Sequence, residues 1–334
     1  MIKIGNIDVK ENVFLAPMSG VSDVPFRKLV KNYGAGLVVS EMIACRAMVL
    51  ETRQSMTKLA KADNQDISVV QLAGCEPEVM AEAARMNEDL GADVIDINFG
   101  CPVKKVTNGD AGSALMRQVP LATKILEATI KAVKIPVTLK MRMGWDHNSL
   151  NAPEIARIAE DLGIKMLTVH GRTRNQLYSG QADWKFIRNV KNAVKIPVIA
   201  NGDIIDFDSA ARALAESGAD GIMIGRGAYG KPWFVNQVIS YLKNKTAPGE
   251  PTLEEQLQII LKHYDEMLEL YGTITGVRMA RKHIGWYSSG KFNSAEFRAR
   301  VMKMDDPLQV KIAVCDYYSQ LIDRSLVNFT SLAA

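Results

Sequence analysis

Short apolar runs alternate with longer amphipathic stretches through most of the chain. The runs are typical of buried β-strands, and the stretches between them have hydrophobic positions at helical spacing. The eight runs are residues 13–18, 36–41, 67–73, 93–98, 137–142, 166–170, 198–201 and 221–225. The clearest amphipathic stretches are residues 76–90, 121–133, 152–162 and 206–217.

The junctions between these segments also repeat. Gly91, Gly163 and Gly218 each follow an amphipathic stretch and precede an apolar run, as C-cap glycines do before a short loop. Ile-Pro-Val segments at 135–137 and 196–198 place a proline at the start of a strand. This repeated strand–helix unit predicts an α/β fold, specifically a (β/α)8 TIM barrel. A doubly wound open sheet is the alternative.

The repeat ends at residues 243–251, which are rich in proline, glycine and polar residues and predict a linker. Thr252 is a predicted helix N-cap, with Glu255 at the position of its capping-box partner. From there the periodicity is helical only. We therefore expect a catalytic barrel in residues 1–245 and a small all-helical domain in residues 251–326, with a tail at 327–334.

The composition is ordinary for a soluble globular protein, and the formal net charge is +4. No apolar run is long enough to span a bilayer, and the N-terminus lacks the regions of a signal peptide. The four cysteines and four histidines are scattered and show no metal-ligand spacing. We expect a cytoplasmic protein with no metal site and no membrane association. The sequence indicates no obligate protein partner.

One segment, Asp-Ile-Asn-Phe-Gly-Cys-Pro at 96–102, places a cysteine directly after a predicted strand. Pro102 ends the strand, and Gly100 allows a tight turn. In α/β folds the reactive groups lie at the carboxyl ends of the strands. Cys101 could therefore be a nucleophile, a metal ligand, a proton donor or a packing residue, and this segment alone does not decide between them.

Polar residues follow or end the other predicted strands too, and a barrel would bring them to one rim. They are Ser19, Gln71, Asn98, Lys140, Arg142, His170, Arg172, Arg174, Asn201, Asp203 and Arg226. Each could be an ordinary polar residue at a loop edge, but the full set predicts a binding site.

Residues 225–230 match G-x-G-x-x-G, after a predicted strand and at the start of a predicted helix. No later strand supplies an acidic ribose ligand, so the segment does not indicate a dinucleotide site. Loops after the last two barrel strands commonly bind one phosphate, which suits a mononucleotide such as FMN. Arg226 would then bind the phosphate, Lys140 would stabilise an anionic reduced flavin, and Gln71 would face the imide edge of the ring.

Together these motifs resemble the tRNA-dihydrouridine synthases, most closely the bacterial B-type branch, over nearly the whole chain. The N-x-G-C-P segment and an R-K-H-x-x-W-Y segment are specific to that resemblance, whereas the others are shared more widely among flavin barrels. The matching segments are residues 16–18, 40–42, 98–102, 111–115, 140–145, 170–173, 201–203 and 281–287.

The resemblance implies an enzyme that holds FMN tightly and reduces the C5=C6 bond of uridines in tRNA, with NADPH or NADH as electron donor. Hydride would pass from flavin N5 to C6, and Cys101 would give a proton to C5. A thiol suits that role because its unperturbed pKa of about 8.5 keeps it mostly protonated at neutral pH. The family's flavin-binding positions correspond to Pro17, Met18, Ser19, Gln71, Lys140, His170, Asn201, Gly202, Asp203, Gly225 and Arg226.

The nearest alternative is an FMN-dependent barrel oxidoreductase that acts on a small molecule, of the dihydroorotate dehydrogenase type. It would share the barrel and the phosphate loops. The helical domain and its R-K-H-x-x-W-Y segment argue against it.

Residues 270–295 contain no acidic side chain, and Arg278, Arg281 and Lys282 share one predicted helix face. The face could be merely solvated, or it could bind tRNA phosphates together with basic residues on the barrel rim. Asn98 is expected to hydrogen-bond the uracil, or else to cap its turn. The full set of expected substrate and tRNA contacts is Asn98, Lys104, Arg142, Arg172, Arg174, Arg278, Arg281, Lys282 and His283.

Overall fold

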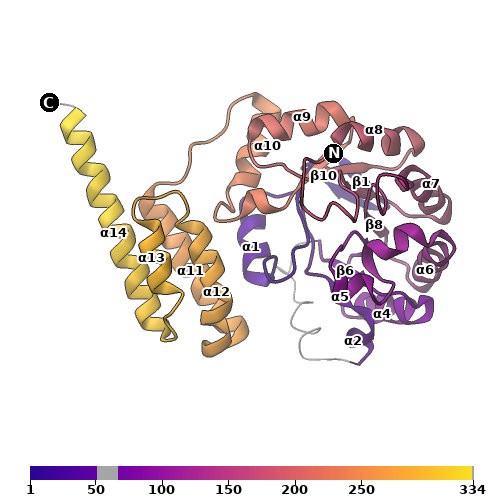
Figure 1. The fold of residues 1–334 in the computed structure, drawn as a ribbon, viewed down its shortest axis with the longest axis horizontal. Helices are drawn as coiled ribbons and strands as arrows, with labels where there is room; N and C mark the ends of the chain where they lie inside the picture. The colour runs from indigo at the N-terminus through magenta and orange to yellow at the C-terminus, as the bar shows by residue number, and fades with distance from the viewer. Residues whose placement is uncertain (51–66, 333–334) are drawn as a thin grey trace. The chain divides into compact units, whose positions relative to one another are not determined.

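The computed structural model describes residues 1–50 and 67–332, and its first compact unit is built around a sheet of nine parallel strands (Figure 1). The strand order is β4-β3-β11-β10-β9-β8-β7-β6-β5. The strands are β3 (Val13–Leu15), β4 (Leu37–Val38), β5 (Ile43–Ala44), β6 (Val69–Ala73), β7 (Val94–Phe99), β8 (Val137–Arg142), β9 (Leu167–His170), β10 (Val198–Asn201) and β11 (Gly221–Ile224).

The sheet closes on itself. Val39, directly after β4, forms a parallel bridge with Val69 on β6, and β5 pairs with β6 further along. β4 and β5 are therefore two pieces of one barrel strand, which leaves eight strand positions in a closed ring. The (β/α)8 prediction is confirmed, and the doubly wound alternative is wrong.

The break in this second strand differs from the continuous strand predicted at 36–41. The hydroxyl of Ser40 accepts the backbone N–H of Gln71 at 2.9 Å, a bond that a backbone carbonyl would make in a regular ladder. The buried carboxylate of Glu41 accepts the backbone N–H of Gly20. Between β4 and β5 the Ser40 N–H still donates to the Val69 carbonyl, and the side chains of Ser40 and Glu41 supply further acceptors for backbone N–H groups.

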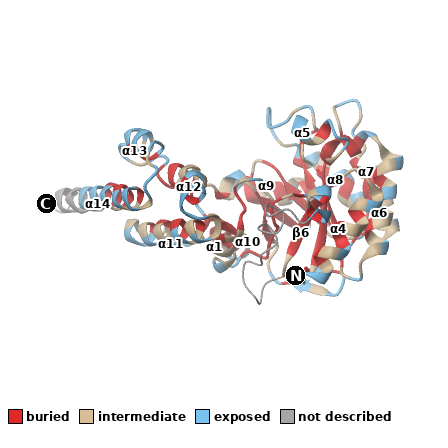
Figure 2. Ribbon diagram, turned by 90° about the horizontal axis from the view of Figure 1, so that it is seen from below, coloured by how far each residue is buried: buried red, intermediate tan, exposed pale blue. Residues whose placement is uncertain are grey.

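Helices follow the strands and cover the outside of the barrel, and the strand residues beneath them are buried (Figure 2). Gly163 and Gly218 end their helices with φ of 111° and 64°, which confirms them as C-cap glycines. The helices of this unit are α1 (Val24–Asn32), α2 (Cys45–Val49), α4 (Pro77–Asp89), α5 (Lys104–Thr107), α6 (Val119–Ala132), α7 (Ala152–Leu162), α8 (Trp184–Ala193), α9 (Phe207–Ser217) and α10 (Phe234–Asn244).

A hairpin that the sequence analysis did not anticipate covers the amino-terminal end of the barrel. Its strands are β1 (Ile2–Ile4) and β2 (Ile7–Val9), which pair antiparallel. Its buried side chains share one apolar cluster with Phe14, Val69 and Ile199 from the barrel strands. The carboxyl end of the barrel is therefore the end left for polar groups.

The second compact unit contains the chain from Pro248 onward together with Tyr229–Trp233. Thr252 caps α11 with Glu255 in the predicted capping box. The helices are α11 (Leu253–Tyr271), α12 (Thr273–Tyr287), α13 (Ser294–Val301) and α14 (Pro307–Leu332). α14 extends past residue 327, where the sequence analysis began a tail. No helix in residues 1–50 or 67–332 has the length and hydropathy needed to cross a membrane.

Candidate functional site

Strand register brings the polar residues of the barrel rim side by side. Asn98 on β7 is paired with Lys140 on β8. His170 on β9 is paired with Arg142 on one side and Asn201 on the other. Because the strands are parallel, these residues share the carboxyl end of the barrel, as the sequence analysis expected.

Cys101 lies on a turn that is fixed by hydrogen bonds on both sides. Asn98 Oδ1 accepts the backbone N–H groups of Gly100 and Cys101 at 3.0 and 2.9 Å. The Cys101 carbonyl accepts the N–H and hydroxyl of Ser113 at 3.0 and 2.9 Å. Gly112 has a φ of 62°, and a Cβ there would lie 2.8 Å from the Cys101 carbonyl oxygen. Glycine is required at that position, and the turn holds the half-buried Cys101 in one place.

Arg142 is a buried support of the same turn rather than a tRNA contact. Its Nε donates to the Gly100 carbonyl at 2.8 Å, and its Nη1 donates to the carbonyls of Thr173 and Leu177 at 2.8 and 2.9 Å. Burial lowers its pKa to about 10. The expectation that Arg142 meets tRNA is wrong, because its side chain is enclosed and its Nε and Nη1 groups donate to backbone carbonyls.

Behind the turn, buried polar side chains form a continuous hydrogen-bond chain. Asp96 Oδ1 accepts the Thr138 hydroxyl at 2.6 Å, and Asp96 Oδ2 accepts Gln71 Nε2 at 2.7 Å. Gln71 Oε1 in turn accepts Asn98 Nδ2 at 2.7 Å. Asn98 therefore caps its turn, the second of the two roles expected for it. No role for Asp96 was predicted from the sequence, although a carboxylate inside an otherwise apolar strand is a visible signal.

Lys140 is a buried cation with a neutral partner. Its Nζ donates to Asn201 Oδ1 at 3.0 Å, and Asn201 Nδ2 donates to the Met223 carbonyl at 2.8 Å. Burial lowers the pKa of Lys140 to about 8, and the nearby Arg142 adds to the effect. Burial, with the surrounding cations, also lowers the pKa of His170 well below its usual range, so that imidazole is neutral at pH 7.

Asp203 joins two arginines. Buried Arg172 donates to Asp203 Oδ1 and Oδ2 at 2.9 and 2.5 Å, and also donates to the Ser179 and Gly180 carbonyls. Burial would raise the pKa of Asp203, but the hydrogen bonds from Arg172 and the Ala182 N–H, together with the charges of Arg172 and Arg226, hold that pKa below its usual range. The expected tRNA contact by Arg172 is wrong, because its guanidinium is enclosed by these acceptors. Arg226 is exposed and lies 3.3 Å from Asp203 Oδ1.

The predicted phosphate loops follow the neighbouring strands β10 and β11. β11 also pairs with β3, so Pro17, Met18 and Ser19 follow the strand on the other side of Gly225. A Cβ at Gly225 would lie 3.6 Å from the Met18 sulfur. In the other loop, Gly202 has a φ of 116°, and a Cβ there would lie 2.8 Å from the His170 ring. Gly202 therefore packs directly against His170.

The G-x-G-x-x-G segment was predicted to open a helix, but the structure differs. It opens a short 3-10 turn, Arg226–Ala228, and α10 begins only at Phe234. Gly230 has a φ of 67°, and a Cβ there would lie 2.4 Å from the Trp286 carbonyl oxygen within the second unit. The later part of the motif thus serves packing, while Gly225 and Arg226 remain at the strand end.

A cavity of about 820 Å³ lies beside the turn and has Cys101 and Ser19 in its wall. The rest of its lining comes mainly from residues 42–47, 73–76 and 103–111. It includes a second cysteine, Cys75. The sequence analysis did not assign a role to residues 42–47 or 73–76, since the cavity exists only once these loops converge.

The basic side chains of the barrel rim that are at least partly exposed include two that were predicted from the sequence and one that was not. Lys104 is exposed on α5, as expected for a tRNA contact. Arg174 is half-buried, and its guanidinium stacks on Trp145 at 4.5 Å. Arg117 stacks on the same ring at 4.1 Å, a contact that the spacing of these residues in the sequence does not predict.

The basic segment of the second unit divides into exposed and structural residues. Arg278 is exposed on α12, and Lys282 is partly exposed. Arg281 donates to the Met304 carbonyl at 2.8 Å and pairs with Asp305 at 2.7 Å, so it mainly ties α12 to the loop before α14. His283 is buried, and its expected contact with tRNA is wrong.

The R-K-H-x-x-W-Y segment forms part of the core of this unit. The His283 ring meets the His263 ring edge-on at 4.8 Å. Trp286 stacks on Tyr229 at 4.0 Å, and the Tyr287 hydroxyl lies 3.0 Å from His263 Nδ1. These contacts explain why Tyr229–Trp233 groups with the helices.

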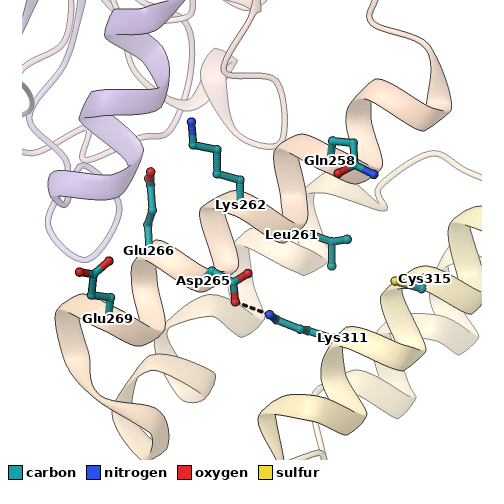
Figure 3. Close-up of a pocket in the computed structure, with 8 residues that line it drawn as sticks. All are labelled: Gln258, Leu261, Lys262, Asp265, Glu266, Glu269, Lys311 and Cys315. Carbon is teal, nitrogen blue, oxygen red and sulfur yellow. Dashed lines mark ion pairs between the residues drawn. The ribbon is translucent and has the colours of Figure 1, made fainter.

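A second cavity, of about 500 Å³, lies between α11 and α14 (Figure 3). Its wall carries the carboxylates of Asp265, Glu266 and Glu269 but only two ammonium groups, Lys262 and Lys311. Lys311 pairs with Asp265 at 2.5 Å. The excess of negative charge makes this groove unsuited to a phosphate backbone.

A family model and the curated relatives of this chain give the same family. The sequence model described as Dihydrouridine synthase (Dus) matches residues 14–322. A probable tRNA-dihydrouridine synthase of Rickettsia bellii is 61% identical over 325 residues, which cover 97% of this chain and 100% of that protein. The tRNA-dihydrouridine synthase B of Xanthomonas axonopodis pv. citri is 47% identical over 321 residues, covering 96% of this chain and 97% of that protein.

Solved structures similar to this chain share its barrel. A 2-naphthoyl-CoA reductase complex has a TM-score of 0.56 at 16% identity, covering 71% of this chain and 51% of that one. An old yellow enzyme homologue from Zymomonas mobilis has a TM-score of 0.54 at 15% identity, covering 76% of this chain and 94% of that one. At these identities the likeness extends to the fold alone, and this chain spans about half the length of the first protein.

Proposed function

Because the chain belongs to the dihydrouridine synthase family, we propose that it reduces the C5=C6 bond of uridines in tRNA to dihydrouridine. The observation that carries the proposal is the position of Cys101, on a rigid turn in the wall of a cavity at the carboxyl end of the barrel. The family match favours this function over the small-molecule flavin oxidoreductase that the sequence left as an alternative.

The polar strand ends fit a flavin mononucleotide. Lys140 is a buried ammonium whose hydrogen bond among the described residues goes to the neutral Asn201, so it can serve an additional, electron-rich acceptor. Arg226 is exposed beside Gly225, where it can meet a phosphate dianion. Gln71 retains one N–H and one lone pair beyond its two hydrogen bonds. When bound and reduced by NADPH, the flavin supplies the hydride for C6.

Cys101 is the proposed proton donor for C5. The Asn98 and Ser113 hydrogen bonds hold its backbone, which directs the thiol to one position beside the bound base. The cavity lets a base enter and lets water return the proton afterwards. General acid catalysis of this kind contributes about 10²- to 10⁴-fold in rate.

Five basic side chains that are exposed or partly exposed are proposed to hold the tRNA. They are Lys104, Arg117, Arg174, Arg278 and Lys282, and Arg281 supports the last two by fixing α12. A base buried in folded tRNA must be turned out to enter the cavity, which requires an extensive contact surface with the tRNA. A tRNA substrate places the proposed activity in the cytoplasm.

Replacing each of the two cavity cysteines tests the assignment. We expect Cys101→Ala to keep flavin binding and NADPH oxidation but to lose about 10²-fold or more of dihydrouridine formation. Cys75→Ala is the matched control, since Cys75 lines the same cavity but is not on the turn. Single-turnover reduction of unmodified tRNA by the pre-reduced enzyme is the measurement. Full activity of Cys101→Ala, or a loss confined to Cys75→Ala, would refute the role of Cys101.

A further inference from the structure

We propose that Asp96 is a positioning residue that fixes the Cys101 turn through the side-chain amides of Gln71 and Asn98. Its role in base reduction rests on the function proposed above. Its role in ordering the turn does not, because that depends only on contacts within the chain.

Asp96 sets the direction of the hydrogen bonds along the chain, because a carboxylate only accepts hydrogen bonds. Its two oxygens receive the Thr138 hydroxyl and an N–H of Gln71. The nitrogen of the Gln71 amide must therefore face Asp96, and its oxygen must face the other way. Without such a partner, the two ends of an amide have nearly the same shape and either could face inward.

The same logic passes to the next amide. Gln71 Oε1 is an acceptor, so Asn98 must turn its Nδ2 toward it, at 2.7 Å. Asn98 Oδ1 is then left facing the N–H groups of Gly100 and Cys101. A reversed Asn98 would present N–H donors to these two N–H groups and could not cap the turn. One carboxylate thus sets the orientation of two amides and the geometry of Cys101.

The cost of burying Asp96 supports a specific role. The side chain is enclosed in the barrel, and among the described residues no cation lies within ion-pair distance of it. Burying a charge without a paired cation is unfavourable, and an apolar residue would suit this strand position better. Burial raises the pKa of Asp96, whereas its two hydrogen bonds and the nearby Lys140 act in the opposite direction. Burial outweighs these contributions, so the pKa of Asp96 is raised overall. The form that orders the amides is the carboxylate, which accepts from Thr138 and Gln71.

Exchanging the acid and the amide tests the mechanism. In the Asn98→Asp variant, carboxylates lie on both sides of the Gln71 side-chain amide. That amide has one nitrogen, so it can donate to only one of the two carboxylates. We expect an about 100-fold loss of single-turnover uridine reduction, because a displacement of about 1 Å at a reacting group can have that effect. Adding Asp96→Asn restores a consistent chain in reverse. The carboxylate introduced at position 98 accepts from the turn and from Gln71, and the amide introduced at position 96 donates to Gln71. We expect the rate of single-turnover uridine reduction by the double variant to recover to within about 10-fold of the native rate.

Two further readouts use the flavin-free protein. The thermal unfolding midpoint and the rate of Cys101 alkylation by iodoacetamide, resolved by peptide mass spectrometry, should both shift in Asn98→Asp and return in the double variant. The control pairs Asn98→Asp with Asp110→Asn, which has the same net charge but changes an exposed carboxylate whose hydrogen bond among the described residues comes from Gln118. The variant that combines Asn98→Asp with Asp110→Asn should not regain the native unfolding midpoint or alkylation rate.

A double variant as impaired as Asn98→Asp in all three measurements would overturn the proposal, as would equal recovery by the Asp110 control. If the native protein forms no dihydrouridine, the proposed function fails. The unfolding and alkylation data would then still decide whether Asp96 orders the turn.

Discussion

Lys140 illustrates how the surroundings of a side chain decide its chemistry. It is buried at the carboxyl end of the barrel, and its pKa is lowered to about 8 because burial disfavours the ammonium. Arg142 acts in the same direction, and Asp96 acts against it. At neutral pH the group is still charged, and it loses its proton as the pH rises through about 8.

This gives a pH-dependent prediction for flavin binding. We expect flavin-free protein to bind FMN less tightly above about pH 8, because the ammonium that attracts the ring has lost its proton. Lys140→Met should weaken binding about 10- to 100-fold at pH 7, since a hydrogen bond from a charged group contributes about 1.5–3 kcal/mol. The same substitution should also remove the pH dependence of FMN binding. Fluorescence titration between pH 7 and 9 measures both effects, and an unchanged pH profile in the variant would rule out this role.

Residue types in the sequence predicted the polar rim but not the burial of its members. Arg142, Arg172 and His283 were expected to meet tRNA because they are basic and close to the rim or the helical segment. In the folded chain, backbone carbonyls, Asp203 and neighbouring rings enclose them. Spacing along a chain reports which residues share an element, and it does not report what covers them.

At the scale of elements, the boundaries that could be predicted were those encoded by local chemistry. α7 spans the predicted residues because Gly163 ends it, and α11 begins after Thr252 because of its capping box. The division of the second barrel strand into β4 and β5 was not predictable. It depends on Ser40 bonding to Gln71, which is distant in sequence.

The element α12 allows a test that separates RNA contact from stability. Arg278→Glu should weaken tRNA binding several-fold and lower its salt dependence, with an unchanged unfolding midpoint, because the side chain is exposed. Arg281→Glu should lower the midpoint, because it breaks the bonds to Met304 and Asp305. Fluorescence polarisation with tRNA at several salt concentrations, together with thermal unfolding, distinguishes them. Equal tRNA affinity in Arg278→Glu and the native protein would remove α12 from the proposed interface.

At the scale of the whole molecule, the sequence predicted a barrel followed by helices, and the structure adds how each unit is completed. The hairpin of β1 and β2 covers one end of the barrel with apolar side chains. Tyr229–Trp233 leaves the barrel segment and joins the helical unit through Trp286. Neither feature has a periodic signal, because each depends on contacts between distant segments.

If this chain reduces uridines in tRNA, the dihydrouridine at its target positions depends on its gene. The most direct measurement is a map of dihydrouridine across all tRNAs from cells with and without the gene, and from cells carrying only Cys101→Ala. We predict that specific uridine positions lose dihydrouridine when the gene is absent. They should stay unmodified with Cys101→Ala and regain dihydrouridine with the native chain. An identical map in all of these cells would contradict the account.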